Sequence, residues 1–256
     1  MSTGIEIPVL IIWAGCEAAV SAAAKPVVFC RLLRSAPSDY AAFITMADLD
    51  RVLSWFDAGT LLRPDPLRPS TYSLSYALAA AGGAKVDLDE SASRIADVIG
   101  EPDHVILVLA DGLGMNLIEA LPESSFLRRH LAFEMRSVFP SSTAPALTSL
   151  ASGQWPAEHG LLGWFVYLPE LDLHTISLPF RQRFSGRPLS DLGVTGPDLF
   201  AWPALLSGYA RHARLLMPRN IARSVYTSAI AGGVTVDGYK SLDQAVMRLL
   251  TRLDGQ

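Results

Sequence analysis

The sequence predicts an α/β fold in which a mostly parallel sheet lies between helices as a three-layer sandwich. Residues 104–111 (HVILVLAD) form a continuous apolar run that ends in a carboxylate, which is typical of a strand buried on both faces. Short apolar strands alternate with helical patterns through the rest of the chain, as expected of a parallel sheet covered by helices. The chain has 256 residues, of which 50% are hydrophobic and 18% charged, so it can form a core and is not intrinsically disordered.

The first 45 residues differ from the rest of the chain. An apolar run over 7–16 is too short to span a membrane, and the only charge before it is acidic, unlike a secretory signal. We expect residues 1–45 to be a poorly ordered or weakly packed extension, residues 46–256 to be the domain, and the protein to be cytoplasmic. A translation start at Met46 and export of the protein are the alternatives.

The local pattern then predicts the elements in order. Helices are expected over 46–57, 70–82 and 89–99, followed by the strand 104–111 and a helix opened by GLGMNLIEAL. Further along we expect a strand at 132–139, a capped helix ended by Gly153, and a hairpin or two short strands at 164–178. A helix at 203–210, a strand at 214–218, a helix from Asn220 to about 230 and a strand at 234–236 follow, and after a capping box at Ser241 we expect a helix to about Leu253.

Polar side chains at two of these predicted junctions point to chemistry. Asp111 follows an apolar strand, and ligands of open α/β sheets gather at the carboxyl ends of strands. One crossover later, Ser141, Ser142 and Thr143 precede a helix. Each could be a helix cap, but a helix N-terminus also attracts anions, and a hydroxyl there can attack phosphorus or an acyl carbon.

The two blocks VILVLADGLG (105–114) and FPSSTAPALTSLASGQWPAEHGLLG (139–163) resemble the type I phosphodiesterase / nucleotide pyrophosphatase branch of the alkaline phosphatase superfamily. The resemblance implies that Thr143 is the nucleophile and that Asp111 and Thr143 are metal ligands. It implies two divalent ions, usually zinc, as cofactors, and hydrolysis of a phosphodiester or pyrophosphate bond in a small-molecule phosphate ester through a phospho-threonine intermediate. The metals matter because a threonine hydroxyl is a poor nucleophile at neutral pH.

The chain departs from the family pattern at two points. Where nucleotide-handling members have Asn, this chain has Ala146, which puts nucleotide specificity in doubt. The Asp and His ligands that the family places after the nucleophile are not found. Asp172 and His174 are expected to be an exposed pair, His159 to shape a turn and His212 to lie on the surface. We therefore expect a chain truncated at its C-terminus, with two ligands where catalytic zinc needs at least three.

Composition and motifs limit the other functions. A net charge of −4 disfavours binding to nucleic acid polymers, and two cysteines are too few for a disulfide scaffold. Gly112 and Gly114 suggest a dinucleotide-binding turn, with Glu134 as ribose partner, but Leu117 occupies the third glycine position. A non-catalytic module that binds an anion or a protein partner is the other alternative. No membrane span is expected, and the oligomeric state is left open.

Overall fold

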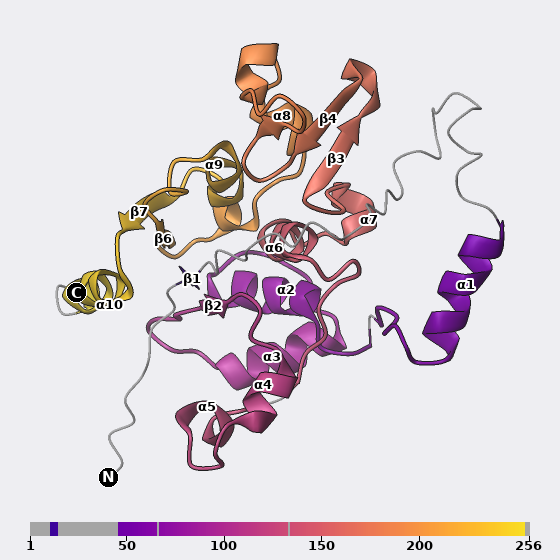
Figure 1. The fold of residues 1–256 in the computed structure, drawn as a ribbon. Coiled ribbons are helices and arrows are strands. Elements are labelled where there is room, and N and C mark those ends of the chain that lie inside the picture. Colours follow the sequence, from indigo (N-terminus) through magenta and orange to yellow (C-terminus); the bar gives the residue numbers. More distant parts are fainter. Residues whose placement is uncertain (1–10, 15–45, 66, 133, 254–256) are drawn as a thin grey trace, which may run out of the picture.

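The chain is a mixed α/β fold with two small sheets and short helices (Figure 1). The computed structural model describes residues 11–14, 46–65, 67–132 and 134–253. One sheet is parallel and has four strands, and the other is antiparallel and has three. The predicted α/β class is therefore confirmed as a mixed α/β fold, whereas a three-layer sandwich around one mostly parallel sheet is not.

The helices and strands have the following bounds. The strands are β1 (Ile11–Ala14), β2 (Val108–Ala110), β3 (Phe165–Leu168), β4 (Leu173–Ile176), β5 (Arg181–Gln182), β6 (Arg214–Pro218) and β7 (Thr235–Tyr239). The α-helices are α1 (Met46–Asp57), α2 (Thr71–Ala81), α3 (Glu90–Ile99), α4 (Met115–Ala120), α5 (Phe126–Arg129), α6 (Thr143–Ser152), α7 (Pro156–His159), α8 (Gly196–Leu199), α9 (Val225–Ala231) and α10 (Leu242–Leu253). The 3-10 helices are η2 (Pro169–Leu171), η3 (Leu189–Leu192) and η4 (Leu205–Gly208).

The parallel sheet has the strand order β2-β1-β6-β7, so a strand from the first 45 residues lies at its centre. Ile12 in β1 is opposite Val108 in β2 on one side and Leu216 in β6 on the other. Four residues of the expected extension thus pair within the sheet, because their backbone supplies the partner that both β2 and β6 need. The remainder of that extension, residues 1–10 and 15–45, lies outside the described residues.

Strand β2 is shorter and more exposed than the sequence predicts. Only Val108–Ala110 of the run 104–111 is a strand, and Val108 is 60% exposed. Within the described residues β2 has a neighbour on one side only, so it is an edge strand. The prediction of burial on both faces is wrong, because Val108 and Ala110 are exposed and Leu109 is only partly buried.

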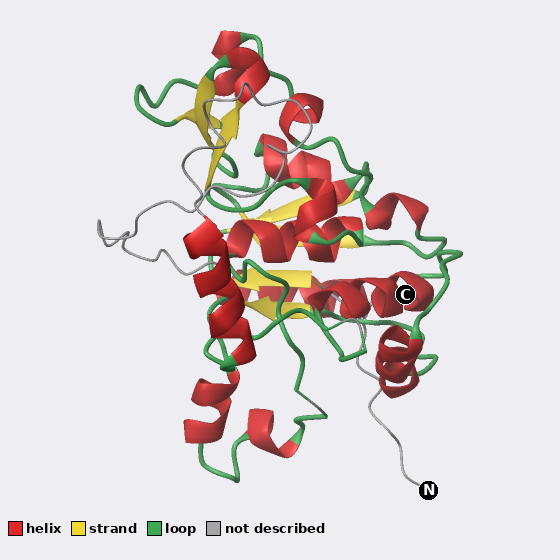
Figure 2. Cartoon of the chain, turned by 90° about the vertical axis from the view of Figure 1, so that its right-hand side faces the viewer, coloured by secondary structure: helices red, strands yellow, loops and turns green. Residues whose placement is uncertain are grey.

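The antiparallel sheet consists of β3, β4 and β5, and it confirms the predicted hairpin at 164–178. Phe165 is opposite Ile176 and Leu168 is opposite Leu173. Figure 2 shows this hairpin projecting at the top of the molecule, away from the parallel sheet. The chain bends between the strands through η2, after which Asp172 adopts a positive φ of 48°.

Most of the core lies between α6, α9, β6 and the segment 189–206, which contains η3, α8 and the start of η4. Its fully buried members include Leu161, Leu189, Met217 and Tyr226. A smaller cluster joins β6, β7 and α10 through Leu216, Tyr239 and Ala245. These apolar contacts place α6, whose first residue is Thr143, on the best-packed part of the molecule.

Local signals predicted several elements correctly and others incorrectly. Helices α1, α2, α3 and α10 confirm their predictions. Ser70 and Asp89 cap α2 and α3 by accepting hydrogen bonds from the backbone N–H groups of Ser73 and Ala92. The predicted strand at 132–139 is wrong, because among its described residues only Arg136 makes a bridge, to Ser70. The predicted helices at 203–210 and from Asn220 are corrected to η4 and to α9, which Ser224 caps.

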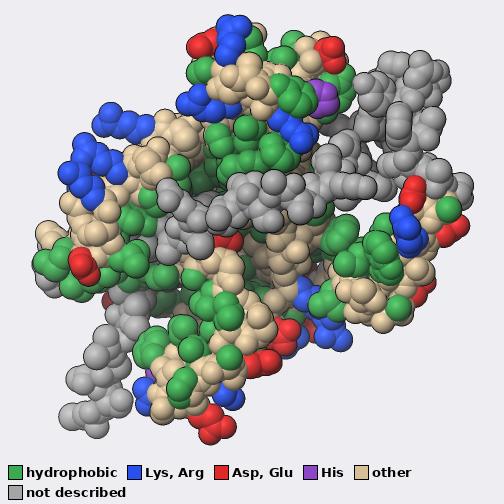
Figure 3. All heavy atoms as spheres, in the orientation of Figure 1, with side chains coloured by type: hydrophobic (Ala, Val, Ile, Leu, Met, Phe, Trp, Pro, Cys, Tyr) green, Lys and Arg blue, Asp and Glu red, His purple; other side chains and the backbone are tan. Residues whose placement is uncertain are grey.

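Within the described residues, no helix is both long enough and apolar enough to cross a membrane. Figure 3 shows hydrophobic side chains gathered on the surface over α1 and over the α4–α5 region. The exposed members of the second group include Leu117, Phe126 and Leu127. This region therefore contrasts with the core around α6, where the large side chains are buried.

Candidate active site

Asp111 is the first residue after β2 and lies in an exposed turn. Gly112 follows it with a φ of +74°, a left-handed conformation that glycine adopts without steric cost. Gly114 then precedes α4, so the chain reverses within a few residues. The N-cap residue of α4 is Gly114, which has no side chain that could cap the helix. The Asp111 carboxylate does not cap α4 either and is free to face another element.

Thr143 is the first residue of α6 and is half-buried. Ser142 is the N-cap residue, but its side chain makes no capping hydrogen bond. Pro145 fits the first turn because proline lacks the N–H group that would have no partner there. Because Ser142 makes no capping bond, Pro145 has no N–H and the Ala146 N–H donates to Ser142 O, the N–H groups of Thr143 and Ala144 are those left without an acceptor inside the helix.

The structure brings the two predicted site residues together. The Thr143 Oγ1 hydroxyl donates a hydrogen bond to Asp111 Oδ2 at 3.1 Å, across 32 residues of sequence. The predicted strand before Thr143 does not form, so the contact does not come from two neighbouring strand ends. It comes instead from the packing of α6, which presents its first residue to the turn after β2.

Two buried hydrogen bonds hold α6 in place. Thr148 Oγ1 and Tyr226 Oη in α9 are 3.0 Å apart, and Ser149 Oγ lies 3.1 Å from His159 Nε2. The face of α6 that packs inward has small residues, among them Ala144, Thr148 and Ser149, which allows α2 and α9 to approach closely. The position of Thr143 is therefore determined by contacts made one and two turns further along the same helix.

His159 is a structural histidine, and its geometry confirms the prediction that it shapes a turn. Its Nδ1 accepts a hydrogen bond from the Leu161 backbone N–H at 3.1 Å, so in the neutral ring the proton lies on Nε2, which faces Ser149. Burial lowers the pKa of His159 to about 4. With its proton on the Ser149 side and a low pKa, this ring cannot act as a general base toward the Ser149 hydroxyl at neutral pH.

The other candidate ligands make contacts within their own surroundings. Asp172 Oδ1 accepts a hydrogen bond from the Tyr167 hydroxyl at 2.9 Å. The His174 ring packs beside the rings of Tyr167 and Phe184, with centroids 4.8 and 5.4 Å away. Asp172, His174 and His212 are exposed, as the sequence predicts. Glu134, the ribose partner of the dinucleotide alternative, is exposed in an irregular segment and not in a strand.

The described residues supply only part of a ligand set for the two divalent ions that the resemblance implies. Asp111 and Thr143 offer two adjacent oxygen ligands, whereas catalytic zinc needs at least three from the protein. Among the residues that the structure describes, no group of three or more His, Cys, Asp and Glu side chains could hold a metal ion.

Sequence reasoning missed the residues that position Thr143. Tyr226 is 78 residues from its partner Thr148, and no local pattern predicts that pairing. The small residues on one face of α6 were a usable signal, since Ala144, Thr148 and Ser152 recur at helical spacing. Such spacing in a helix indicates close packing against a neighbour.

Comparison with known proteins agrees with this region of the chain. A family model described as type I phosphodiesterase / nucleotide pyrophosphatase matches residues 105–182, which is consistent with that branch of the alkaline phosphatase superfamily. The matched range contains both Asp111 and Thr143. At the level of the family, the match supports a phosphoester hydrolase that acts on a small-molecule phosphoester, and the family generally depends on divalent metal ions. No solved structure matches the chain.

Proposed function

We propose that the chain carries the nucleophile of a metal-dependent phosphoester hydrolase, and that Thr143 attacks the phosphorus of a phosphodiester or pyrophosphate. The observation that carries the proposal is the 3.1 Å hydrogen bond from Thr143 Oγ1 to Asp111 Oδ2 at the start of α6. The family match over residues 105–182 supports the reaction class. The cytoplasmic location remains a prediction from the sequence.

The arrangement has two features that suit attack on a phosphate. The start of α6 offers backbone N–H groups and the positive end of the helix dipole, which together favour a bound phosphate oxygen. The Asp111 carboxylate accepts the hydroxyl hydrogen of Thr143, so the oxygen lone pairs point away from Asp111. Attack then forms a bond between Thr143 Oγ1 and phosphorus as the bond to the leaving ester oxygen breaks, and the hydroxyl proton passes by way of solvent to that oxygen. Water later hydrolyses the bond between phosphorus and Thr143.

Metal dependence is part of the proposal. A carboxylate is a far weaker base than an alkoxide, so Asp111 cannot remove the proton of an alcohol unaided. A divalent ion lowers the pKa of a bound water from about 15.7 to about 7, and a comparable effect on a hydroxyl would be needed here. The remaining ligands for such an ion are not among the described residues.

The test is hydrolysis of bis(4-nitrophenyl) phosphate with and without added zinc or manganese. We expect metal-stimulated turnover that Thr143→Ala abolishes and Thr143→Ser retains in part, since serine keeps the hydroxyl. Asp111→Asn should lower metal content and rate together, whereas the exposed His212→Gln serves as a matched control. Mass spectrometry of quenched reactions should find a 4-nitrophenyl phosphate group on Thr143, because only one of the two nitrophenolate groups leaves in the first step. Turnover by Thr143→Ala at the unchanged rate would contradict the assignment.

A second candidate function is anion binding without turnover. The observation that favours it is that the described residues contain no group of three or more metal-binding side chains. This candidate predicts that inorganic phosphate binds at the start of α6, that Thr143→Ala weakens this binding, and that no added metal produces turnover. Calorimetry with phosphate alongside the hydrolysis assay distinguishes the two candidates.

A further inference from the structure

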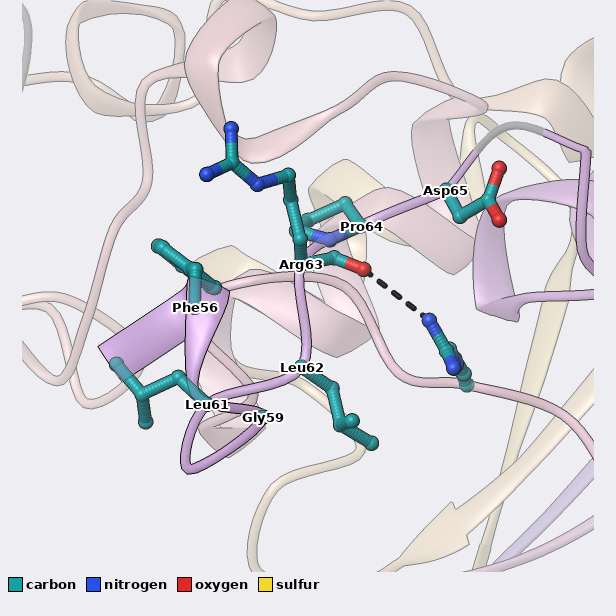
Figure 4. Close-up of a pocket in the computed structure, with 8 residues that line it drawn as sticks. Phe56, Gly59, Leu61, Leu62, Arg63, Pro64 and Asp65 are labelled. Atoms are coloured by element: carbon teal, nitrogen blue, oxygen red, sulfur yellow. Dashed lines mark hydrogen bonds between the residues drawn. The ribbon is translucent and has the colours of Figure 1, made fainter. Parts of the chain in front are cut away.

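A pocket of about 420 Å³ lies outside the site of Asp111 and Thr143 (Figure 4). The end of α1 and the loop after it form its apolar wall, with Phe56, Leu61 and Leu62. Arg136, from the segment that leads toward α6, contributes a cation to the lining. A volume of this size falls in the range of pockets that hold small organic ligands.

Arg136 is held firmly in this position. Its backbone N–H donates to Pro69 O at 2.9 Å, and its carbonyl accepts from the Thr71 N–H at 3.0 Å, so the residue is anchored beside the start of α2. Its side chain is half-buried, and Nη1 donates to the Arg63 carbonyl at 3.3 Å, which is the dashed line in Figure 4. The remaining N–H groups of the guanidinium are available to an acceptor inside the pocket.

The charges around the pocket leave Arg136 uncompensated. Arg63 pairs with Asp57 at 3.5 Å, and Asp65 pairs with Arg68 at 3.6 Å. Arg136 has no carboxylate within 4.0 Å among the described residues, so the region carries one more positive than negative charge. A half-buried cation beside an apolar wall favours an anion that brings its own apolar surface.

We propose that this pocket binds a small organic anion in which an apolar, ring-sized body is joined to a carboxylate or phosphate group. The body contacts Phe56, Leu61 and Leu62, and the anionic group accepts hydrogen bonds from Arg136. The site is distinct from Thr143, although the two share a segment, because Phe139 touches Phe56 with ring centroids 5.2 Å apart. The proposal does not depend on the proposed hydrolytic function.

The experiment is isothermal calorimetry of the full chain at pH 7.5 with 1-naphthoate as the probe. The probe is a carboxylate and not a phosphoester, so it is not a substrate of the proposed hydrolytic site at Thr143. We expect 1-naphthoate to bind, and both 1-naphthalenemethanol, which lacks the charge, and acetate, which lacks the ring, to bind at least tenfold more weakly. Equal affinity for the alcohol would overturn the proposal, because it would show that the negative charge contributes nothing and that the probe binds only to exposed apolar surface.

Variants locate the binding. Arg136→Gln should weaken 1-naphthoate at least tenfold, about 1.4 kcal/mol, while Arg136→Lys should lose less because it keeps the charge. Leu62→Asn, at a side chain that is 60% exposed and so dispensable for folding, should also weaken binding. Arg223→Gln, an exposed arginine elsewhere, and Thr143→Ala should leave it unchanged. Unchanged affinity in Arg136→Gln and Leu62→Asn, or loss of binding in Thr143→Ala, would overturn the proposal.

Discussion

The surroundings of α6 and the segment from β2 to α5 differ in how their apolar side chains are placed. Around α6, Leu161 and Tyr226 are almost fully buried, and buried hydrogen bonds connect the helix to α7 and α9. Between β2 and α5, Val108, Leu117 and Phe126 are 60, 47 and 63% exposed. The candidate nucleophile thus lies on the well-packed region and its carboxylate partner on the weakly packed one, which predicts that the two respond differently to substitution.

The largest expected effect comes from removing a buried side chain beside α6. Leu161→Ala should lower the free energy of unfolding by about 2–5 kcal/mol, because it leaves a cavity in the core. The matched change in the exposed region, Leu117→Ala, should alter it by less than about 0.5 kcal/mol. Urea denaturation of both variants measures the difference. Similar losses in the two variants would show that the regions are packed alike.

The next effect is a pH dependence caused by His159. Burial lowers the pKa of His159 to about 4, from 6.5 for an exposed histidine. Between these pH values the unfolded chain binds a proton that the folded chain does not, so stability is complete above pH 6.5 and decreases as the pH falls toward 4. The expected slope from this group is about 1.4 kcal/mol per pH unit, on the order of 3 kcal/mol in all.

Urea denaturation at pH 7, 6 and 5 measures this slope against that of two variants. His159→Gln should show a flatter dependence, because glutamine does not titrate, whereas the exposed His212→Gln should keep the slope of the unmodified chain. An unaltered slope in His159→Gln would mean that this ring is accessible to protons in the folded state.

The hydrogen bond between Thr148 and Tyr226 should give a smaller effect. Thr148→Val or Tyr226→Phe alone leaves one buried hydroxyl without its partner and should cost about 1–3 kcal/mol. The double variant should cost less than the sum of the two, since no unpaired hydroxyl remains. A double-mutant cycle by chemical denaturation gives the coupling free energy between the two hydroxyl groups, which we expect to be about 1 kcal/mol. Strict additivity would show that the two hydroxyls do not interact.

The smallest effect on stability is expected at the candidate site itself. Asp111 is exposed and Thr143 half-buried, so Thr143→Ala and Asp111→Asn should each change the free energy of unfolding by less than about 0.5 kcal/mol. Thermal unfolding checks this, and it also ensures that a loss of turnover in these variants is not a loss of folding. A large destabilisation would identify the Asp111–Thr143 hydrogen bond as structural.

Local signals account for what the sequence predicted well. Ser70 and Asp89 are side-chain caps next to helical apolar patterns, and the helices begin there. Ser241 Oγ accepts from the Gln244 N–H at 3.2 Å, as the predicted capping box requires. These elements depend on contacts within a few residues, which a reader of the sequence can see directly.

Non-local pairing accounts for what could not be predicted. Ile12 pairs with Leu216 across about 200 residues, and a short apolar run shows no sign of where its partner lies. The closeness of Asp111 and Thr143 was predicted, but by way of a strand at 132–139 that does not form. The alternation of apolar residues there has no neighbouring strand to complete it, so the segment remains irregular.

The small side chains on the inner face of α6 have a practical meaning for protein engineering. Enlarging Ser149 would push the helix away from His159 and shift Thr143 with it, although the two residues are six positions apart. The exposed side chains around α4 and α5, among them Leu117 and Phe126, offer positions where bulk can be added without filling the packed interface of α6.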